Sequence, residues 1–98
     1  MTLSVKLEVP VEVMARQVGE ETVILHLESG TYYGLDAVGA RIWQLIVEGR
    51  SLGEICRVMI DEYDVEQLRI ERDVLDLASA LEAKRLVRQT AWECHTSA

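Results

Sequence analysis

Short apolar stretches bounded by glycine and acidic turn residues open the chain, and longer stretches with apolar residues at helical spacing follow. Residues 13–18 form the first short stretch. Residues 22–27, rich in β-branched and apolar side chains, form the second after a turn at Gly19, and residues 31–35 form the third. Because a two-stranded hairpin is marginal in water, these stretches predict one three-stranded antiparallel sheet.

The loop before the third strand determines which side chains share a face of this sheet. A two-residue turn at Ser29-Gly30 pairs Leu27 with Tyr32, whereas a three-residue loop with Gly30 in the left-handed conformation pairs Leu27 with Thr31. We favour the second register. One face of the sheet then carries Val23, Leu25, Leu27, Tyr33 and Leu35. Of these, Tyr33 and Leu35 are interpreted as core residues. The opposite face then carries Ile24, His26, Tyr32 and Gly34.

Three helices are predicted after the sheet. Asp36 is a candidate cap for a helix over residues 37–48, and Ser51 with Glu54 forms a capping box for the next. The third helix covers residues 66–84. Its buried stripe is predicted to contain Ile70, Val74, Leu77, Ala78 and Leu81. The fold class is therefore α+β and winged-helix-like, with a three-stranded antiparallel sheet followed by three helices.

Length and charge limit the possible functions. A chain of 98 residues with 49% hydrophobic content forms one core. We assign the single folded domain to residues 13–87, between an N-terminal extension (1–12) and a C-terminal tail (88–98). The net charge of −7 disfavours nucleic acid and anionic membranes, because phosphates are bound mainly by Lys and Arg. The third helix is itself acidic, so a winged-helix DNA-binding or dimerisation module is kept only as an alternative.

Catalytic and metal-binding patterns are not found in the sequence. His26 is interpreted as a surface residue without a nearby nucleophile, and Cys94-His95 lacks the ligand number of a zinc site. Cys56 reads as a small core residue. We therefore predict no enzyme activity, no cofactor and no metal. Without a secretory signal or an apolar run of ~20 residues, the predicted location is cytoplasmic.

A series of short motifs occurs in a fixed order along the chain: Gly30-Thr-Tyr-Tyr-Gly-Leu-Asp36, Gly39, Ile42-Trp43, Gly49, Asp73-Val74, Leu77, Leu81 and Arg85-Leu86-Val87. This series resembles the PqqD-like family, the precursor-recognition domains of ribosomal peptide natural-product pathways. The resemblance implies a sheet packed on three helices. It also implies binding of a leader peptide as a fourth strand beside the third, in the groove next to the third helix.

Two kinds of pathway are compatible with the resemblance. The chain is most similar to stand-alone leader-binding proteins of lasso-peptide clusters, whose partners are a leader peptidase and a cyclase. The alternative is a peptide chaperone of the pyrroloquinoline-quinone type, which serves a radical S-adenosylmethionine enzyme. In either pathway we expect a monomer that binds a precursor peptide, with no nucleic acid and no membrane.

The residues at the third strand support peptide binding independently of the resemblance. Between Thr31 and Leu35 the strand has no charge, proline or bulge to block pairing with another chain, which favours recognition by strand addition. On the third helix, Asp73 and Asp76 can pair with a basic leader residue and Arg69 with an acidic one. The predicted peptide-binding residues are Thr31, Tyr32, Tyr33, Gly34, Leu35, Arg69, Asp73, Asp76, Leu77 and Ala80.

Overall fold

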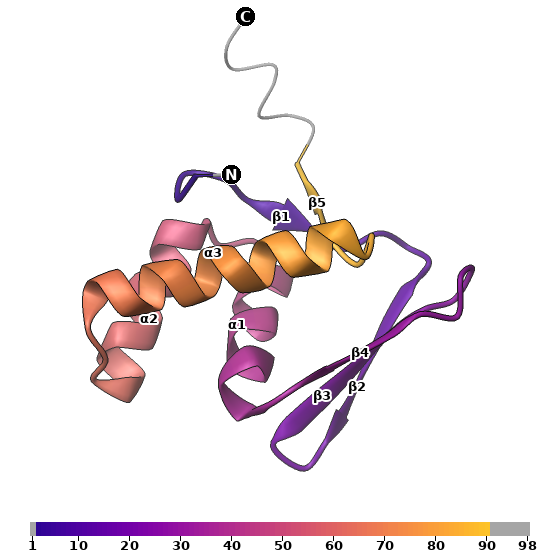
Figure 1. Cartoon of the computed structure of the whole chain (residues 1–98), viewed down its shortest axis with the longest axis horizontal. Coiled ribbons are helices and arrows are strands. Elements are labelled where there is room, and N and C mark those ends of the chain that lie inside the picture. The colour runs from indigo at the N-terminus through magenta and orange to yellow at the C-terminus, as the bar shows by residue number, and fades with distance from the viewer. Residues whose placement is uncertain (1, 91–98) are drawn as a thin grey trace, which may run out of the picture.

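A computed structural model describes residues 2–90 and shows an antiparallel sheet followed by three helices (Figure 1). The strands of this sheet, in spatial order, are β2 (Val13–Val18), β3 (Glu21–His26) and β4 (Tyr32–Leu35). The helices are α1 (Ala37–Val47), α2 (Leu52–Tyr63) and α3 (Gln67–Ala83). The α+β class and the element order predicted from the sequence are confirmed.

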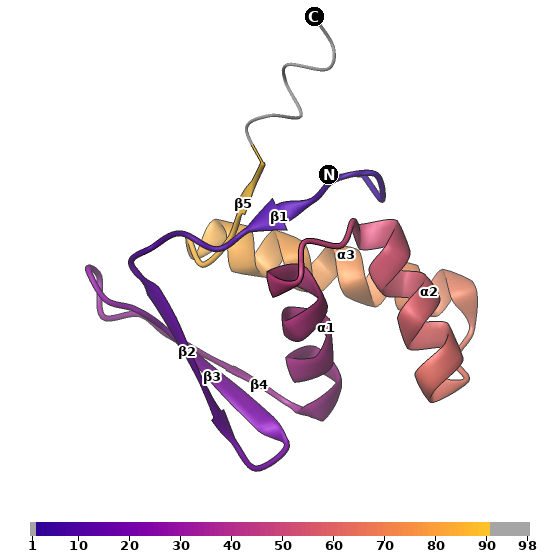
Figure 2. The same cartoon turned by 180° about the vertical axis from the view of Figure 1, so that it is seen from behind.

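The core lies between one face of the sheet and the helices. Helix α1 packs against β3, β4 and α2, and α3 packs mainly on α2 (Figure 2). The predicted stripe of α3 is buried at four positions, Ile70, Val74, Ala78 and Leu81, whereas Leu77 is half-buried. Helix α3 therefore presents a wide apolar face whose margin extends beyond the core.

Both predicted helix caps are present. The carboxylate of Asp36 accepts a 2.9 Å hydrogen bond from the backbone N–H of Gly39 and so starts α1 directly after β4. At the start of α2, the Ser51 hydroxyl accepts from the Glu54 N–H, and the Glu54 carboxylate accepts from the Ser51 N–H at 2.9 Å. These bonds from Ser51 lower the pKa of Glu54 below its ordinary value.

The register between β3 and β4 differs from the prediction by one residue. Ile24 lies opposite Tyr33 and Leu25 opposite Tyr32, because the loop contains four residues, Leu27 to Gly30, rather than three. The His26 N–H donates to the Thr31 carbonyl at 2.9 Å and closes this loop. The inner face of β3 and β4 therefore carries Thr22, Ile24, His26, Tyr33 and Leu35.

Two sequence interpretations fail with this register. Val23, Leu25 and Leu27 lie on the outer face and not with Tyr33 and Leu35, and His26 is 7% exposed rather than a surface residue. Apolar residues occupy both faces of the segment from 23 to 27, so its pattern does not distinguish inside from outside. The buried face was selected by the loop and by packing against α1, which contacts β3.

The N-terminal segment packs on the helices and not on the sheet of β2, β3 and β4. Strand β1 (Leu7–Glu8) pairs with β5 (Arg88–Gln89), and Leu7 is buried. The Gly53 N–H donates to the Leu3 carbonyl at 2.7 Å, which attaches the segment to the start of α2. Most of the predicted tail, with Cys94 and His95, lies outside the described residues. Among residues 2–90, no helix is long and apolar enough to span a membrane.

Candidate functional site

Strand β4 is an edge strand, and within residues 2–90 only β3 pairs with it. Main-chain groups alternate in direction along an antiparallel strand. Since the Thr31 carbonyl accepts from β3, Tyr33 and Leu35 also direct their N–H and C=O groups to β3. The N–H and C=O groups of Tyr32 and Gly34 therefore point away from the sheet and are open to another chain.

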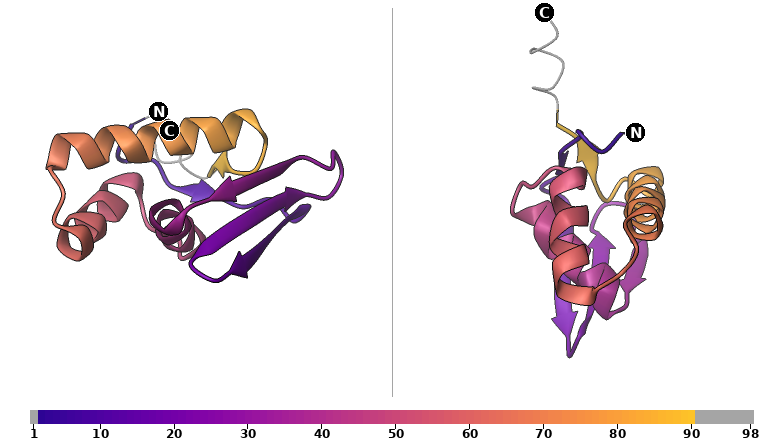
Figure 3. Two further views of the ribbon diagram at one scale, coloured as in Figure 1. Left: turned by 60° about the horizontal axis from the view of Figure 1, so that its bottom comes forward. Right: turned by 90° about the vertical axis from the view of Figure 1, so that its left-hand side faces the viewer.

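A cleft of about 420 Å³ lies beside this edge, between β4, the first turns of α1 and the middle of α3. We call it the β4 cleft. Figure 3 shows that β4 is on the side of the sheet nearest α3, whereas β2 is on the far side. The cleft is lined by Tyr33, Gly34, Leu35, Asp36, Val38, Gly39, Ile42, Asp73 and Leu77.

Half of the predicted site residues line this cleft together, namely Tyr33, Gly34, Leu35, Asp73 and Leu77. The other five predicted residues do not line the cleft. Thr31 precedes β4, and Ala80 is half-buried on α3. Arg69 and Asp76 are exposed on α3, and the Tyr32 side chain is 71% exposed on the outer face of the sheet. For Tyr32, only the main chain faces the open edge.

The contribution of α1 was missed by the sequence reasoning, which treated this helix as core. Val38, Gly39 and Ile42 form the wall of the cleft next to β4. A Cβ atom on Gly39 would lie 3.3 Å from the Leu35 Cβ atom, so the helix approaches the strand closely. A signal was present in the sequence: Asp36 caps α1 directly after β4, so the first turn of this helix must adjoin the strand.

The chemistry of the β4 cleft suits an apolar side chain next to an extended backbone. Val38, Ile42 and Leu77 provide apolar surface, and Asp73 is the carboxylate on the α3 side. Asp73 lies 4.0 Å from the Arg69 guanidinium, but both side chains are largely exposed. Such an exposed ion pair is weak, so the Asp73 carboxylate is available to an incoming cation.

Reactive and metal-binding groups do not gather at the cleft. Within the described part of the chain, no cluster of three or more His, Cys, Asp or Glu side chains is arranged to hold a metal ion. The Cys56 thiol is buried in the core, and burial raises its pKa. The thiol is therefore held in its protonated, less nucleophilic form.

The sheet has a second free edge along β2. The Leu27 N–H donates to the Glu12 carbonyl, so the main-chain groups of Val13, Ala15 and Gln17 point away from β3. The outer face beside β2 bears an apolar hollow of about 330 Å³ that includes Met14 and Tyr32. Figure 3 shows this edge on the side of the sheet away from α3.

Comparisons with known proteins agree with the resemblance found in the sequence. The family model described as coenzyme PQQ synthesis protein D (PqqD) matches residues 21–87. One solved structure, "TbiB1 in Complex with the TbiA(beta) Leader Peptide", is 42% identical, with a TM-score of 0.80 over 86% of this chain and 98% of TbiB1. A second, "Lasso peptide synthetase B1 complexed with the leader peptide", is 26% identical, with a TM-score of 0.78 over 85% of this chain and 98% of that protein's chain. No curated protein matches significantly.

Proposed function

Because the chain belongs to the PqqD family, we propose that it binds the leader segment of a ribosomally made precursor peptide. The observation that carries this proposal is the 42% identity, over 86% of the chain, to a protein solved with its leader peptide. The open edge of β4 next to a cleft with apolar and acidic side chains supports it on independent physical grounds. Both neighbours are complexes with a leader peptide, and one of them is described as a lasso peptide synthetase B1, which favours a lasso-type pathway over the pyrroloquinoline-quinone type.

The proposed mode of binding is addition of the leader as a fourth strand along β4. The main-chain groups of Tyr32 and Gly34 bond to the peptide, and every second peptide side chain then points toward the helices. One apolar side chain fills the β4 cleft against Leu77. On α3, Asp73 and Asp76 attract a basic leader residue and Arg69 an acidic one. Ala80 leaves room for the peptide backbone.

The proposed consequence of binding is delivery of the precursor to the enzymes that process it. The chain itself carries out no reaction in this proposal. It acts as a monomer in the cytoplasm and passes the precursor to a leader peptidase and a cyclase. The description of one neighbour as a lasso peptide synthetase B1 supports a role as one component of a multi-protein synthetase.

Proline substitution at the β4 edge tests this mode of binding. Tyr32→Pro removes an outward N–H and places a ring where the peptide backbone would approach. We expect affinity for a synthetic leader peptide, taken from the precursor gene beside this one, to fall about tenfold or more. Isothermal titration calorimetry measures the affinity, and circular dichroism verifies that the variant is folded.

Ala15→Pro is the matched control, because Ala15 also directs its N–H outward, but from the β2 edge. Its cost to folding should be similar, and leader affinity should stay at the wild-type value. Loss of binding in Ala15→Pro with retention in Tyr32→Pro would move the peptide to β2. Full retention in both variants would contradict strand addition.

A further inference from the structure

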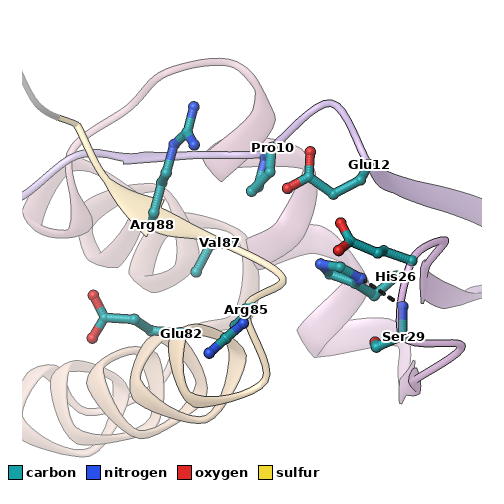
Figure 4. A pocket seen from close by; sticks show the side chains of 9 residues that line it. Pro10, Glu12, His26, Ser29, Glu82, Arg85, Val87 and Arg88 are labelled. Carbon is teal, nitrogen blue, oxygen red and sulfur yellow. Dashed lines mark hydrogen bonds between the residues drawn. The ribbon is translucent and has the colours of Figure 1, made fainter.

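A second cavity, of about 470 Å³, lies where the loop between β3 and β4 faces the C-terminal end of α3 (Figure 4). We call it the hairpin-end cavity. The sheet side contributes Glu12, His26 and Glu28 to the wall, and the end of α3 contributes Glu82 and Arg85. None of these side chains has a role in the function proposed above.

His26 directs a hydrogen-bond donor into this cavity from a buried position. The residue is 7% exposed, and its Nδ1 atom accepts a hydrogen bond from the Ser29 N–H at 3.3 Å. The neutral ring therefore carries its proton on Nε2. No described residue bonds to Nε2, and no side-chain polar atom in residues 2–90 is both fully buried and unpaired. The Nε2–H group thus opens onto the cavity.

Arg85 directs a second donor group into the cavity from the opposite side. It has a φ of 61°, the left-handed conformation that favours glycine. The bonds from Leu86 N–H to the Leu81 carbonyl and from Arg85 N–H to the Glu82 carbonyl define a Schellman end to α3. Glycine would occupy this position with less strain. The guanidinium of Arg85 makes no salt bridge among residues 2–90.

The mixture of donors and acceptors indicates the chemistry of the ligand. His26 Nε2–H and the Arg85 guanidinium donate, whereas the Glu12, Glu28 and Glu82 carboxylates accept. The Arg88 guanidinium also lines the cavity but is paired with Glu8. A carboxylate ligand would meet three glutamates, and a cation would meet Arg85 and an N–H group. A neutral side chain that both accepts and donates, such as a hydroxyl or a carboxamide, satisfies both sides of the cavity.

The cavity continues the path of a peptide bound along β4. It begins at Ser29, two residues before Thr31, and the contact between Lys84 Nζ and the Tyr33 ring, 5.9 Å to the centroid, separates it from the β4 cleft. Lys84 is exposed and free to move aside. Ser29 lines this cavity and Gly34, five positions later, lines the β4 cleft, so an extended peptide beside this segment needs roughly four to six residues to connect the two.

Resting on the proposed leader binding, we propose that the hairpin-end cavity is a second subsite of the groove. It accepts a Ser, Thr, Asn or Gln side chain of the leader, about four to six residues from the side chain in the β4 cleft. His26 and Arg85 donate to this side chain, and Glu12 or Glu28 accepts from it.

Arg85→Gly and His26→Asn test this subsite. Glycine removes the guanidinium and relieves the left-handed strain, so the melting temperature should hold or rise. Asparagine retains an acceptor for the Ser29 N–H but lacks the donor at the Nε2 position. An alanine scan of the synthetic leader peptide, measured by calorimetry, should find one neutral polar residue whose loss weakens wild-type binding about fivefold or more.

For Arg85→Gly and His26→Asn, alanine replacement of the same leader residue should reduce the affinity little further, because the group that bonds to that residue is already removed. Arg72→Gln, on the exposed surface of α3, controls for the loss of one positive charge and should bind all peptides as the wild type does. Nitrogen NMR of His26 should show a protonated Nε2 atom and a shift of its signal when peptide binds.

Three results would overturn the subsite. First, the leader residue whose replacement weakens binding could be acidic or basic. Second, alanine replacement of each leader residue could reduce affinity for both variants as much as for the wild type. Third, the NMR signal of His26 could stay unchanged when the chain is saturated with peptide. If leader binding is lost in Tyr32→Pro and one of these results is found, only the subsite proposal fails. If the wild-type chain binds no leader at all, the proposed function fails as well.

Discussion

Two neighbouring tyrosines on β4 have opposite roles. The Tyr32 side chain is 71% exposed on the outer face, whereas its main chain faces the open edge. Tyr33 is half-buried toward α3, and its main chain is bonded to β3. In the proposed complex, Tyr32 therefore acts through its backbone and Tyr33 through its ring.

In the proposed complex, Leu77 makes the main side-chain contact in the β4 cleft. It lies on α3 opposite β4 and is only half-buried, so it is available to an apolar leader residue. Asp73, one turn earlier, adds a carboxylate at the same wall. The sequence analysis named both residues as peptide-binding, which stays a prediction, and it also placed Leu77 in the buried stripe.

Leu77→Ala should weaken leader binding about tenfold, because part of the apolar contact is removed from the cleft. Leu68→Ala is the matched control on the same helix, since Leu68 is 77% exposed and does not line the cleft. Calorimetric titration with the leader peptide measures both. Equal affinities for Leu77→Ala and the wild type would exclude Leu77 from the contact.

The helices and the sheet differ in how well local sequence specifies them. Helix α1 begins at Ala37 and α2 at Leu52, directly after the predicted caps, because a cap depends on residues only three positions apart. The register of β3 depends on loop length and on distant packing. It was predicted wrongly by one residue, which exchanged the faces of Val23 and Ile24.

Alanine substitution of these two residues tests the observed register through stability. Ile24 is 0% exposed, so Ile24→Ala should lower the free energy of unfolding by about 2–5 kcal/mol. Val23 is 37% exposed, and Val23→Ala should cost less than about 1 kcal/mol. Urea unfolding followed by circular dichroism measures both. A larger loss for Val23→Ala would restore the register predicted from the sequence.

The two ends of the described chain meet on the helical side of the molecule. Strands β1 and β5 pair there, and Leu7 enters the core (Figure 2). Within residues 2–90, this arrangement pairs the N-terminal segment with β5 and leaves β4 paired only with β3. The proposed groove thus depends on where the first ten residues pack, although none of them lines the β4 cleft.

Leu7→Ala should lower the melting temperature by roughly 10–20 °C, because a buried leucine is removed from a small domain. Val11→Ala is the control, since Val11 is 96% exposed and should change the melting temperature little. Thermal unfolding followed by circular dichroism gives both values. An unchanged melting temperature in Leu7→Ala would mean that the N-terminal segment does not contribute to the core.

Local patterns were enough to predict the element order, the helix caps and an unblocked third strand, since each depends on residues close together in the chain. The contribution of α1 to the β4 cleft, the burial of His26 and the approach of Arg85 to the hairpin depend on contacts between distant segments. A pattern along the chain does not tell which face of a strand is covered when both faces carry apolar residues, as in residues 23–27. That choice was made by the four-residue loop and by the helices that pack against the sheet.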